Sequence, residues 1–129
     1  KTHHKMVMLD FTGHACVNCR KMEATVWTDP QVRSFLTDHI VIIQLYVDDR
    51  TELAIEDQQK TSSGKLLKTI GSKWSYLQSS QFESNSQPFY VLMNPANRQV
   101  LVKPKGADYD ATTYLAYLNE GLKAFSLIK

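Results

Sequence analysis

The two cysteines of the sequence, Cys16 and Cys19, lie two residues apart in the segment GHACVNC. Thiols at this spacing can form a structural disulfide, bind a metal ion, or exchange disulfide bonds with another protein. A structural disulfide is the weakest interpretation, because closing so short a loop removes little entropy from the unfolded chain. A chain of 129 residues can also bury enough surface to fold without a covalent link.

Soft-metal binding is a second interpretation of the pair. The layout Gly-x-x-Cys-x-x-Cys is typical of small soft-metal carriers, and two thiolates can hold Cu(I). A structural zinc site would need two further ligands. Zinc-finger spacing is absent from the four histidines, which are His3, His4, His14 and His39. We therefore expect no bound metal and keep Cu(I) carriage as an alternative function.

Thiol–disulfide exchange fits the surroundings of the pair best. The apolar run before Gly13 predicts a strand, and a helix is predicted over Cys16–Trp27. Cys16 then lies at a helix N-terminus, where free backbone N–H groups and the helix dipole stabilise a thiolate. The sequence thus predicts Cys16 as the exposed nucleophile and Cys19, one turn further on, as the resolving thiol.

Asp10 is the only charged residue of the apolar segment MVMLDF. Burial of a carboxyl group raises its pKa toward neutrality. A carboxylate with such a pKa could take the proton from Cys19 as that thiol attacks a disulfide. The other interpretation is a residue at a strand end that only accepts hydrogen bonds from loop amides, and the sequence leaves both open.

Glu23 shares a helical stripe with both cysteines, and the stripe continues to the apolar residues Val26 and Trp27. An acidic residue on the inner face of a helix, one turn below the resolving thiol, favours a functional role. The alternative is a side chain that reaches solvent at the helix edge and pairs with Arg20 or Lys21.

The hydrophobic pattern predicts the elements that must position these residues. Strands are expected at Met6–Phe11, Ile40–Val47, Pro88–Met93 and Gln99–Lys103. Further helices are expected from Pro30, through Ile70, Trp74 and Leu77, and after a cap near Asp110. This order predicts an α/β fold with a mixed central sheet flanked by helices and a polar insertion at residues 48–72, after the second strand.

The composition excludes several classes of protein. The net charge is only +2 and the basic residues are scattered, so we expect no binding of nucleic acid. No apolar run approaches the roughly 18 residues of a membrane span, so this domain is not expected to enter a membrane. We expect one domain over residues 1–129, cut from a longer protein.

Two segments, MLDFTGHACVNCRKMEATVWTDPQVRSFL and NSQPFYVLMNPANRQVL, carry a family resemblance. They resemble the C-terminal thioredoxin-like domain of the transmembrane thiol:disulfide interchange reductases of the DsbD type. The specific features are an Asp six residues before the CxxC pair, a Glu four residues after it, the TDPQV junction and a later Gln-Pro before a strand. One departure is Ala15, where that family often has a bulky aromatic residue.

The resemblance implies a thioredoxin-like fold, a periplasmic location as part of an inner-membrane protein, and action as a monomeric reductase relay. Its partners would be the membrane-embedded domain of the same polypeptide and periplasmic thiol–disulfide proteins. No cofactor beyond the Cys16–Cys19 disulfide is implied. Asp10 and Glu23 would tune the thiols, while Gln87 and a cis Pro88 would bind the partner chain. A non-catalytic thioredoxin-fold binding module stays as a further alternative.

Overall fold

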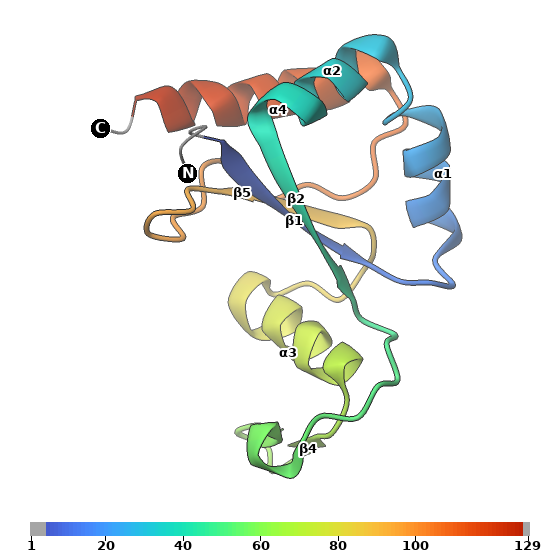
Figure 1. The fold of residues 1–129 in the computed structure, drawn as a ribbon, viewed down its shortest axis with the longest axis vertical. Helices are drawn as coiled ribbons and strands as arrows, with labels where there is room; N and C mark the ends of the chain where they lie inside the picture. The colour runs from blue at the N-terminus through green and yellow to red at the C-terminus, as the bar shows by residue number, and fades with distance from the viewer. Residues whose placement is uncertain (1–4, 128–129) are drawn as a thin grey trace.

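Strand β1 (Met6–Thr12) is the middle strand of a three-stranded sheet in the computed structural model, which describes residues 5–127. It pairs in parallel with β2 (Ile40–Tyr46) and antiparallel with β5 (Phe89–Met93). Helices α2 (Pro30–His39) and α4 (Ala111–Ser126) lie on one face of the sheet and α3 (Ile70–Phe82) lies on the other (Figure 1). The predicted mixed sheet between helices is confirmed.

The helix starts follow from local sequence. Asp29 accepts hydrogen bonds from the first backbone N–H groups of α2, and Pro30 occupies the first turn, where a missing N–H costs nothing. Asp110 caps α4 in the same way. The helix after the cysteines, α1 (Val17–Thr25), is shorter than the predicted Cys16–Trp27 because Cys16 is its N-cap and Val26 its C-cap.

Most of the core lies between the sheet and the pair α2 and α4. Alternate residues of β1 point to this side, which buries Met6 and Met8 completely against Tyr114 and Leu118 of α4. The opposite face is covered by α3 only at the end of the sheet, where Phe11 and its neighbours on β2 and β5 are buried. The hydrophobic core is therefore extensive between the sheet and the pair α2 and α4, and it is confined to one end of the sheet on the side of α3.

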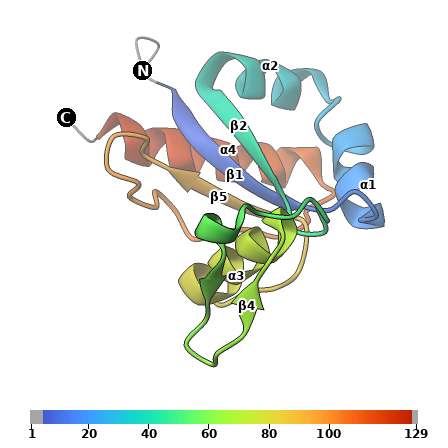
Figure 2. The same cartoon turned by 60° about the horizontal axis from the view of Figure 1, so that its bottom comes forward.

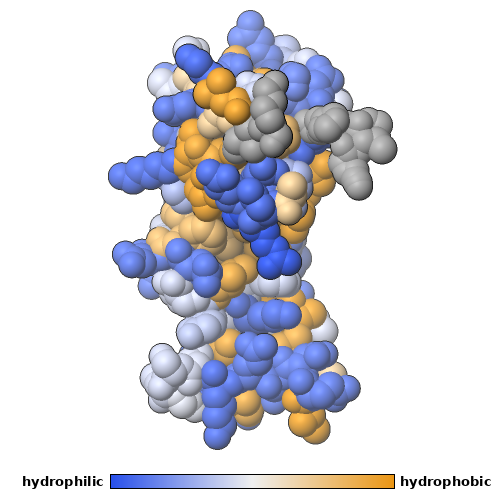
Figure 3. Space-filling model, turned by 90° about the vertical axis from the view of Figure 1, so that its left-hand side faces the viewer, coloured by the Kyte–Doolittle hydropathy of each residue, from blue (hydrophilic) through white to orange (hydrophobic). Residues whose placement is uncertain are grey.

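Strand β2 was expected from an apolar run, but only part of it is buried. It is an edge strand, and the side chains of Val41 and Ile43 are 47% and 42% exposed. They are exposed because α3 covers only the far end of the strand. An apolar groove of about 900 Å³ lies there, lined among others by Val7, Ile43 and Trp74. Figure 3 shows apolar side chains gathered in the upper half and at the waist of this face of the molecule, among polar ones.

The predicted strand Gln99–Lys103 does pair antiparallel with β5, but only through isolated bridges and not as a continuous strand. Val100 pairs with Met93, and Lys105 pairs with Tyr90. The two bridges are five residues apart on this segment but three apart on β5. The extra length bulges away from β5 next to Pro104, which has no N–H to donate to a ladder.

The polar insertion after β2 contains short regular elements. They are the 3-10 turn η1 (Ile55–Asp57) and a small hairpin of β3 (Gln59–Lys60) and β4 (Leu66–Leu67). Figure 2 shows the hairpin beside α3. None of the helices in residues 5–127 combines the length and the hydropathy that crossing a bilayer requires.

Candidate active site around the CxxC pair

Cys16 and Cys19 form a disulfide just after the C-terminal end of β1, with 5.3 Å between their Cα atoms. Cys16 is the N-cap of α1, and its Sγ atom accepts a hydrogen bond from the backbone N–H of Cys19 at 3.1 Å. Cys16 is half-buried, whereas only 1% of Cys19 is exposed. This asymmetry supports Cys16 as the attacking thiol and Cys19 as the resolving thiol, and both roles stay predictions.

The carboxyl group of Asp10 is buried on the side of β1 that faces α1 and α4. Burial raises its pKa to about 6, partly offset by a hydrogen bond from Gln44 Nε2 to Oδ2 at 3.2 Å. The neighbouring carboxylate of Glu23 raises the pKa further, and the Arg20 guanidinium lowers it. Within residues 5–127, Oδ1 of Asp10 has no hydrogen-bond partner. The group can therefore gain and lose a proton near neutral pH.

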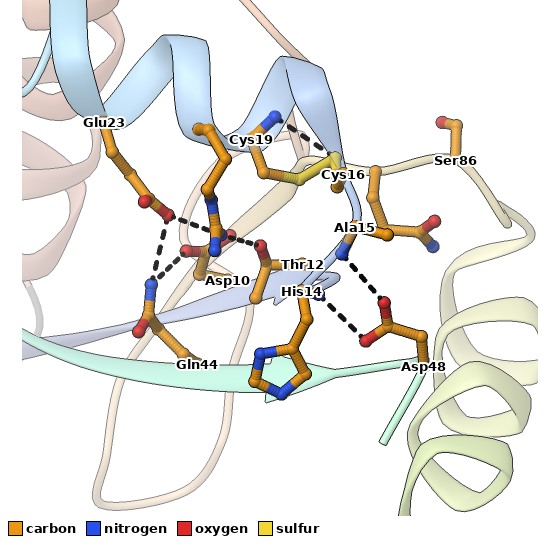
Figure 4. Close-up of a disulfide and its surroundings, with 12 residues drawn as sticks. Asp10, Thr12, His14, Ala15, Cys16, Cys19, Glu23, Gln44, Asp48 and Ser86 are labelled. Carbon is orange, nitrogen blue, oxygen red and sulfur yellow. Dashed lines mark hydrogen bonds and ion pairs between the residues drawn. A yellow bond between two sulfur atoms is a disulfide. The ribbon is translucent and has the colours of Figure 1, made fainter. Parts of the chain in front are cut away.

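Glu23 lies close to Asp10 but is not sealed from solvent. Its side chain is 28% exposed, and Oε2 accepts hydrogen bonds from Arg20 Nη2 at 3.0 Å and from Gln44 Nε2 at 3.4 Å. Arg20 Nη2 also donates to Thr12 Oγ1 at 3.0 Å. Glu23 pairs with Arg20, as the second interpretation expected, and it also shares the amide of Gln44 with Asp10 (Figure 4). Its functional role stays a prediction.

The end of β2 supplies three site residues that the sequence analysis missed: Gln44, Tyr46 and Asp48. Asp48 accepts backbone hydrogen bonds from His14 at 2.9 Å and Ala15 at 3.1 Å, and these bonds lower its pKa. The Tyr46 ring stacks on the His14 ring with 4.0 Å between centroids. Their spacing could have revealed them, because side chains two residues apart along an extended segment lie on the same side. The end of a strand that pairs in parallel with β1 lies beside the loop that follows β1.

Gln87 and Pro88 come from the segment that enters β5, and the peptide bond between them is cis, as the resemblance implied. Ser86, just before them, is among the residues around the disulfide in Figure 4. The side-chain amide of Gln87 donates to Gln78 Oε1 at 2.8 Å on α3, so the segment is tied to the helix below. Binding of a partner chain by Gln87 and Pro88 stays a prediction.

The comparison with family models finds one whose description is thioredoxin-like domain, and it matches residues 1–122. The chain belongs to the thioredoxin-like domain family. The comparison with curated proteins found no match for this sequence.

The thioredoxin-like domain also resembles solved structures. The oxidoreductase DsbH is 19% identical with a TM-score of 0.66, over 95% of this chain and 75% of DsbH. A thioredoxin-fold protein from Helicobacter pylori is 16% identical with a TM-score of 0.66, over 98% and 74% of the two chains. A thioredoxin from Thermus thermophilus is 20% identical with a TM-score of 0.61, over 92% and 75%. These identities establish a shared fold.

The thioredoxin-like domain thus carries a Cys16–Cys19 disulfide at a helix N-terminus, an arrangement consistent with a thiol:disulfide oxidoreductase. Among residues 5–127, no three His, Cys, Asp or Glu side chains gather into a group that could hold a metal ion. His3 and His4 lie outside the described residues. Binding of Cu(I) by two thiolates needs no such group, so it is addressed by experiment below.

Proposed function

We propose that this domain is a protein-disulfide reductase that works as a relay. The Cys16–Cys19 dithiol would receive electrons from a membrane-embedded domain and pass them to a disulfide of a partner protein. The observation that carries the proposal is the position of Cys16. It is accessible at the N-cap of α1 and its Sγ accepts a backbone N–H, next to a buried carboxyl whose pKa is about 6.

In the first step, the Cys16 thiolate attacks one sulfur of the partner disulfide. That sulfur–sulfur bond breaks, the partner's other sulfur leaves as a thiolate and takes a proton, and a mixed disulfide forms through Cys16. The N–H of Cys19 and the N-terminus of α1 favour the thiolate before attack.

In the second step, Cys19 loses its proton and attacks Sγ of Cys16. The partner sulfur leaves reduced, and the Cys16–Cys19 disulfide is left behind. Two electrons pass to the partner. Its two leaving thiolates take up two protons, one from solvent and one that replaces the proton released by Cys19. Asp10 accepts the proton of Cys19, and Glu23 acts on Asp10 through their shared Gln44 amide. Burial of Asp10 supports this role, because a carboxylate with a pKa of about 6 is a stronger base than an ordinary one.

The resemblance to the DsbD type supports the finer features of the proposal. The domain would act in the periplasm as part of an inner-membrane protein, as a monomer, and without a metal or organic cofactor. Electrons would come from the membrane-embedded domain of the same polypeptide and go to periplasmic thiol–disulfide proteins. Gln87 and Pro88 would present an edge for strand-to-strand pairing with the partner chain.

The test uses the Cys19→Ser variant in its reduced form, mixed with an oxidised disulfide protein such as insulin. We expect a covalent adduct through Cys16 that dithiothreitol releases, and none with Cys16→Ser. Absence of an adduct from Cys19→Ser with every disulfide substrate contradicts the assigned roles. Tight 1:1 binding of Cu(I) by the reduced wild type, without reductase turnover, would favour the metal-carrier alternative.

A further inference from the structure

We propose that Asp48 is a positioning residue of the redox site. Its carboxylate holds the loop of His14 and Ala15, and this keeps Cys16 at the N-cap of α1. The catalytic consequence rests on the proposed function. The effect on the Cys16 thiol does not, because it can be measured in the reduced domain without any partner.

The contact joins two parts of the chain that are far apart in sequence. Oδ1 of Asp48 accepts the N–H of His14 at 2.9 Å, and Oδ2 accepts the N–H of Ala15 at 3.1 Å, so each oxygen holds one of two successive amides. The backbone bond from Val47 N–H to Thr12 O, 2.9 Å long, fixes the start of the segment that carries Asp48. The carboxylate therefore spans from the end of β2 to the loop after β1 (Figure 4).

The loop is closely packed between Asp48 and Cys16. A Cβ atom on Gly13 would lie 3.2 Å from Asp48 Oδ2 and 3.5 Å from Cys16 Cβ. The N–H of Cys16 in turn donates to Gly13 O at 3.2 Å, which closes the turn before α1. A displacement of the loop at His14 or Ala15 would therefore be passed directly to Cys16.

A second contact from the same strand supports the loop. The rings of Tyr46 and His14 stack 4.0 Å apart at an interplanar angle of 15°. β2 and the segment that follows it thus hold both the backbone and the side chain of His14. Two independent contacts on one loop show that its conformation is fixed by β2 and its extension, as well as by its own turn.

Simple electrostatics would not favour a carboxylate at this place. A negative charge beside the nucleophile opposes formation of the Cys16 thiolate. The positioning role explains the presence of the Asp48 carboxylate beside the thiol. The carboxylate holds Cys16 where its Sγ atom accepts the N–H of Cys19, and that bond stabilises the thiolate. The charged groups around this thiol come from three elements: Asp10 on β1, Arg20 and Glu23 on α1, and His14, Asp48 and Asp49 on the loops.

The neighbouring Asp49 provides a matched control. Its carboxylate accepts the N–H of Thr51 at 2.9 Å within its own loop. Among the hydrogen bonds of residues 5–127, none joins this carboxylate to the loop of His14 and Ala15, although it is close enough to His14 and Asp48 to feel their charges. Asp48→Asn and Asp49→Asn remove the same charge at adjacent positions. Only Asp48→Asn also removes one of the two acceptors that hold the loop, because an amide nitrogen cannot accept a hydrogen bond.

The experiment measures alkylation of reduced Cys16 by iodoacetamide from pH 5 to 9 in the Cys19→Ser background, together with thiolate absorbance at 240 nm. We expect Asp49→Asn to react at the wild-type rate or slightly faster. We expect Asp48→Asn to react about fivefold more slowly than Asp49→Asn at pH 6.5, with a higher Cys16 pKa, because the loop bond is lost. Equal rates and equal pKa values in the two variants would overturn the proposal.

A measurement on the wild-type protein tests the proposal even if the Asp48→Asn variant fails to fold. The amide protons of His14 and Ala15 should shift together in NMR spectra as acid protonates Asp48, because both donate to its carboxylate. Amide shifts that do not move with Asp48 would also overturn the proposal. If the wild-type domain fails to reduce any disulfide, the proposed function fails, while these two measurements still decide the role of Asp48.

Discussion

Asp10 and Glu23 accept hydrogen bonds from the same atom, Nε2 of Gln44, at 3.2 and 3.4 Å. The orientation of this amide is set at its other end, where the Tyr46 hydroxyl donates to Gln44 Oε1 at 3.2 Å. Asp10 and Gln44 are also direct partners in the register of β1 and β2. The two carboxylates are thus coupled through a side chain whose position is fixed by strand pairing.

Gln44→Met should raise the pKa of Asp10 further above about 6. The wild-type hydrogen bond lowers this pKa, and Met keeps the length of the side chain without a donor. A hydrogen bond worth about 1 kcal/mol corresponds to roughly a fivefold change in proton affinity. Carboxyl-carbon NMR titration of Asp10 measures it directly. Tyr46→Phe, which keeps the ring on His14 and loses only the hydroxyl, should give a smaller change, and an unchanged Asp10 pKa in Gln44→Met would show that the amide does not couple the pair.

Asp10→Asn should slow the second step of disulfide exchange and leave the first step nearly unchanged. In the wild type, resolution of the mixed disulfide should accelerate as pH rises through about 6, where Asp10 loses its proton. Stopped-flow release of partner thiol measures this step. Its rate in Asp10→Asn should fall by roughly 10²-fold and no longer change near pH 6. A wild-type pH profile retained in the double variant Asp10→Asn, Glu23→Gln would demote both carboxylates to structural residues.

Asp10→Asn should stabilise the fold at neutral pH. The pKa of Asp10 is raised from 3.8 to about 6, so the folded state keeps its proton at pH values where the unfolded chain loses it. The contribution of Asp10 to the free energy of unfolding should therefore fall as pH rises from about 4 to 6, by up to about 3 kcal/mol, and then level off. Urea unfolding of the wild type and of Asp10→Asn at pH 4, 5, 6 and 7 measures it as the difference between the two proteins. A difference that stays constant over this range, or that changes in favour of the wild type as pH rises, would contradict it.

Two truncations to alanine should distinguish the extensive core beneath α4 from the smaller core on the side of α3. Leu92→Ala removes a completely buried side chain beneath α4 and should cost about 3 kcal/mol of unfolding free energy. Ile43→Ala removes a side chain that is 42% exposed and should cost about 1 kcal/mol or less. Denaturant unfolding of both variants checks the ratio, and equal costs would mean that the groove beside Ile43 is covered in solution.

The features that could be predicted from the sequence are those that depend on residues close together in the chain. The caps Asp29 and Asp110 were found because capping acts within one helical turn. Cys16 and Cys19 were identified from their spacing, which is also a local feature of the sequence. The apolar letters of β2 predicted a strand, but they could not show that α3 would leave Val41 and Ile43 exposed, since that depends on how far a distant helix reaches.

The rest of the site depends on contacts across the sheet. Asp48 begins the predicted polar insertion, and its bonds to His14 and Ala15 span more than thirty positions in the chain. Gln44 has no special local pattern, and its role follows only from lying opposite Asp10. The segment after β5 failed for a similar reason, because the bulge next to Pro104 is visible only against the β5 ladder.

The parallel pairing of β1 and β2 sets Asp10 opposite Gln44 and Thr12 opposite Tyr46. Because side chains alternate between faces, loss of a single residue within β2 would invert the whole strand. Leu45 would then be turned toward the acidic pair, and Gln44 would take the place of Ile43 in the apolar groove. Length in this strand is consequently as constrained as the identity of the cysteines, so insertions and deletions here should be far less tolerated than substitutions.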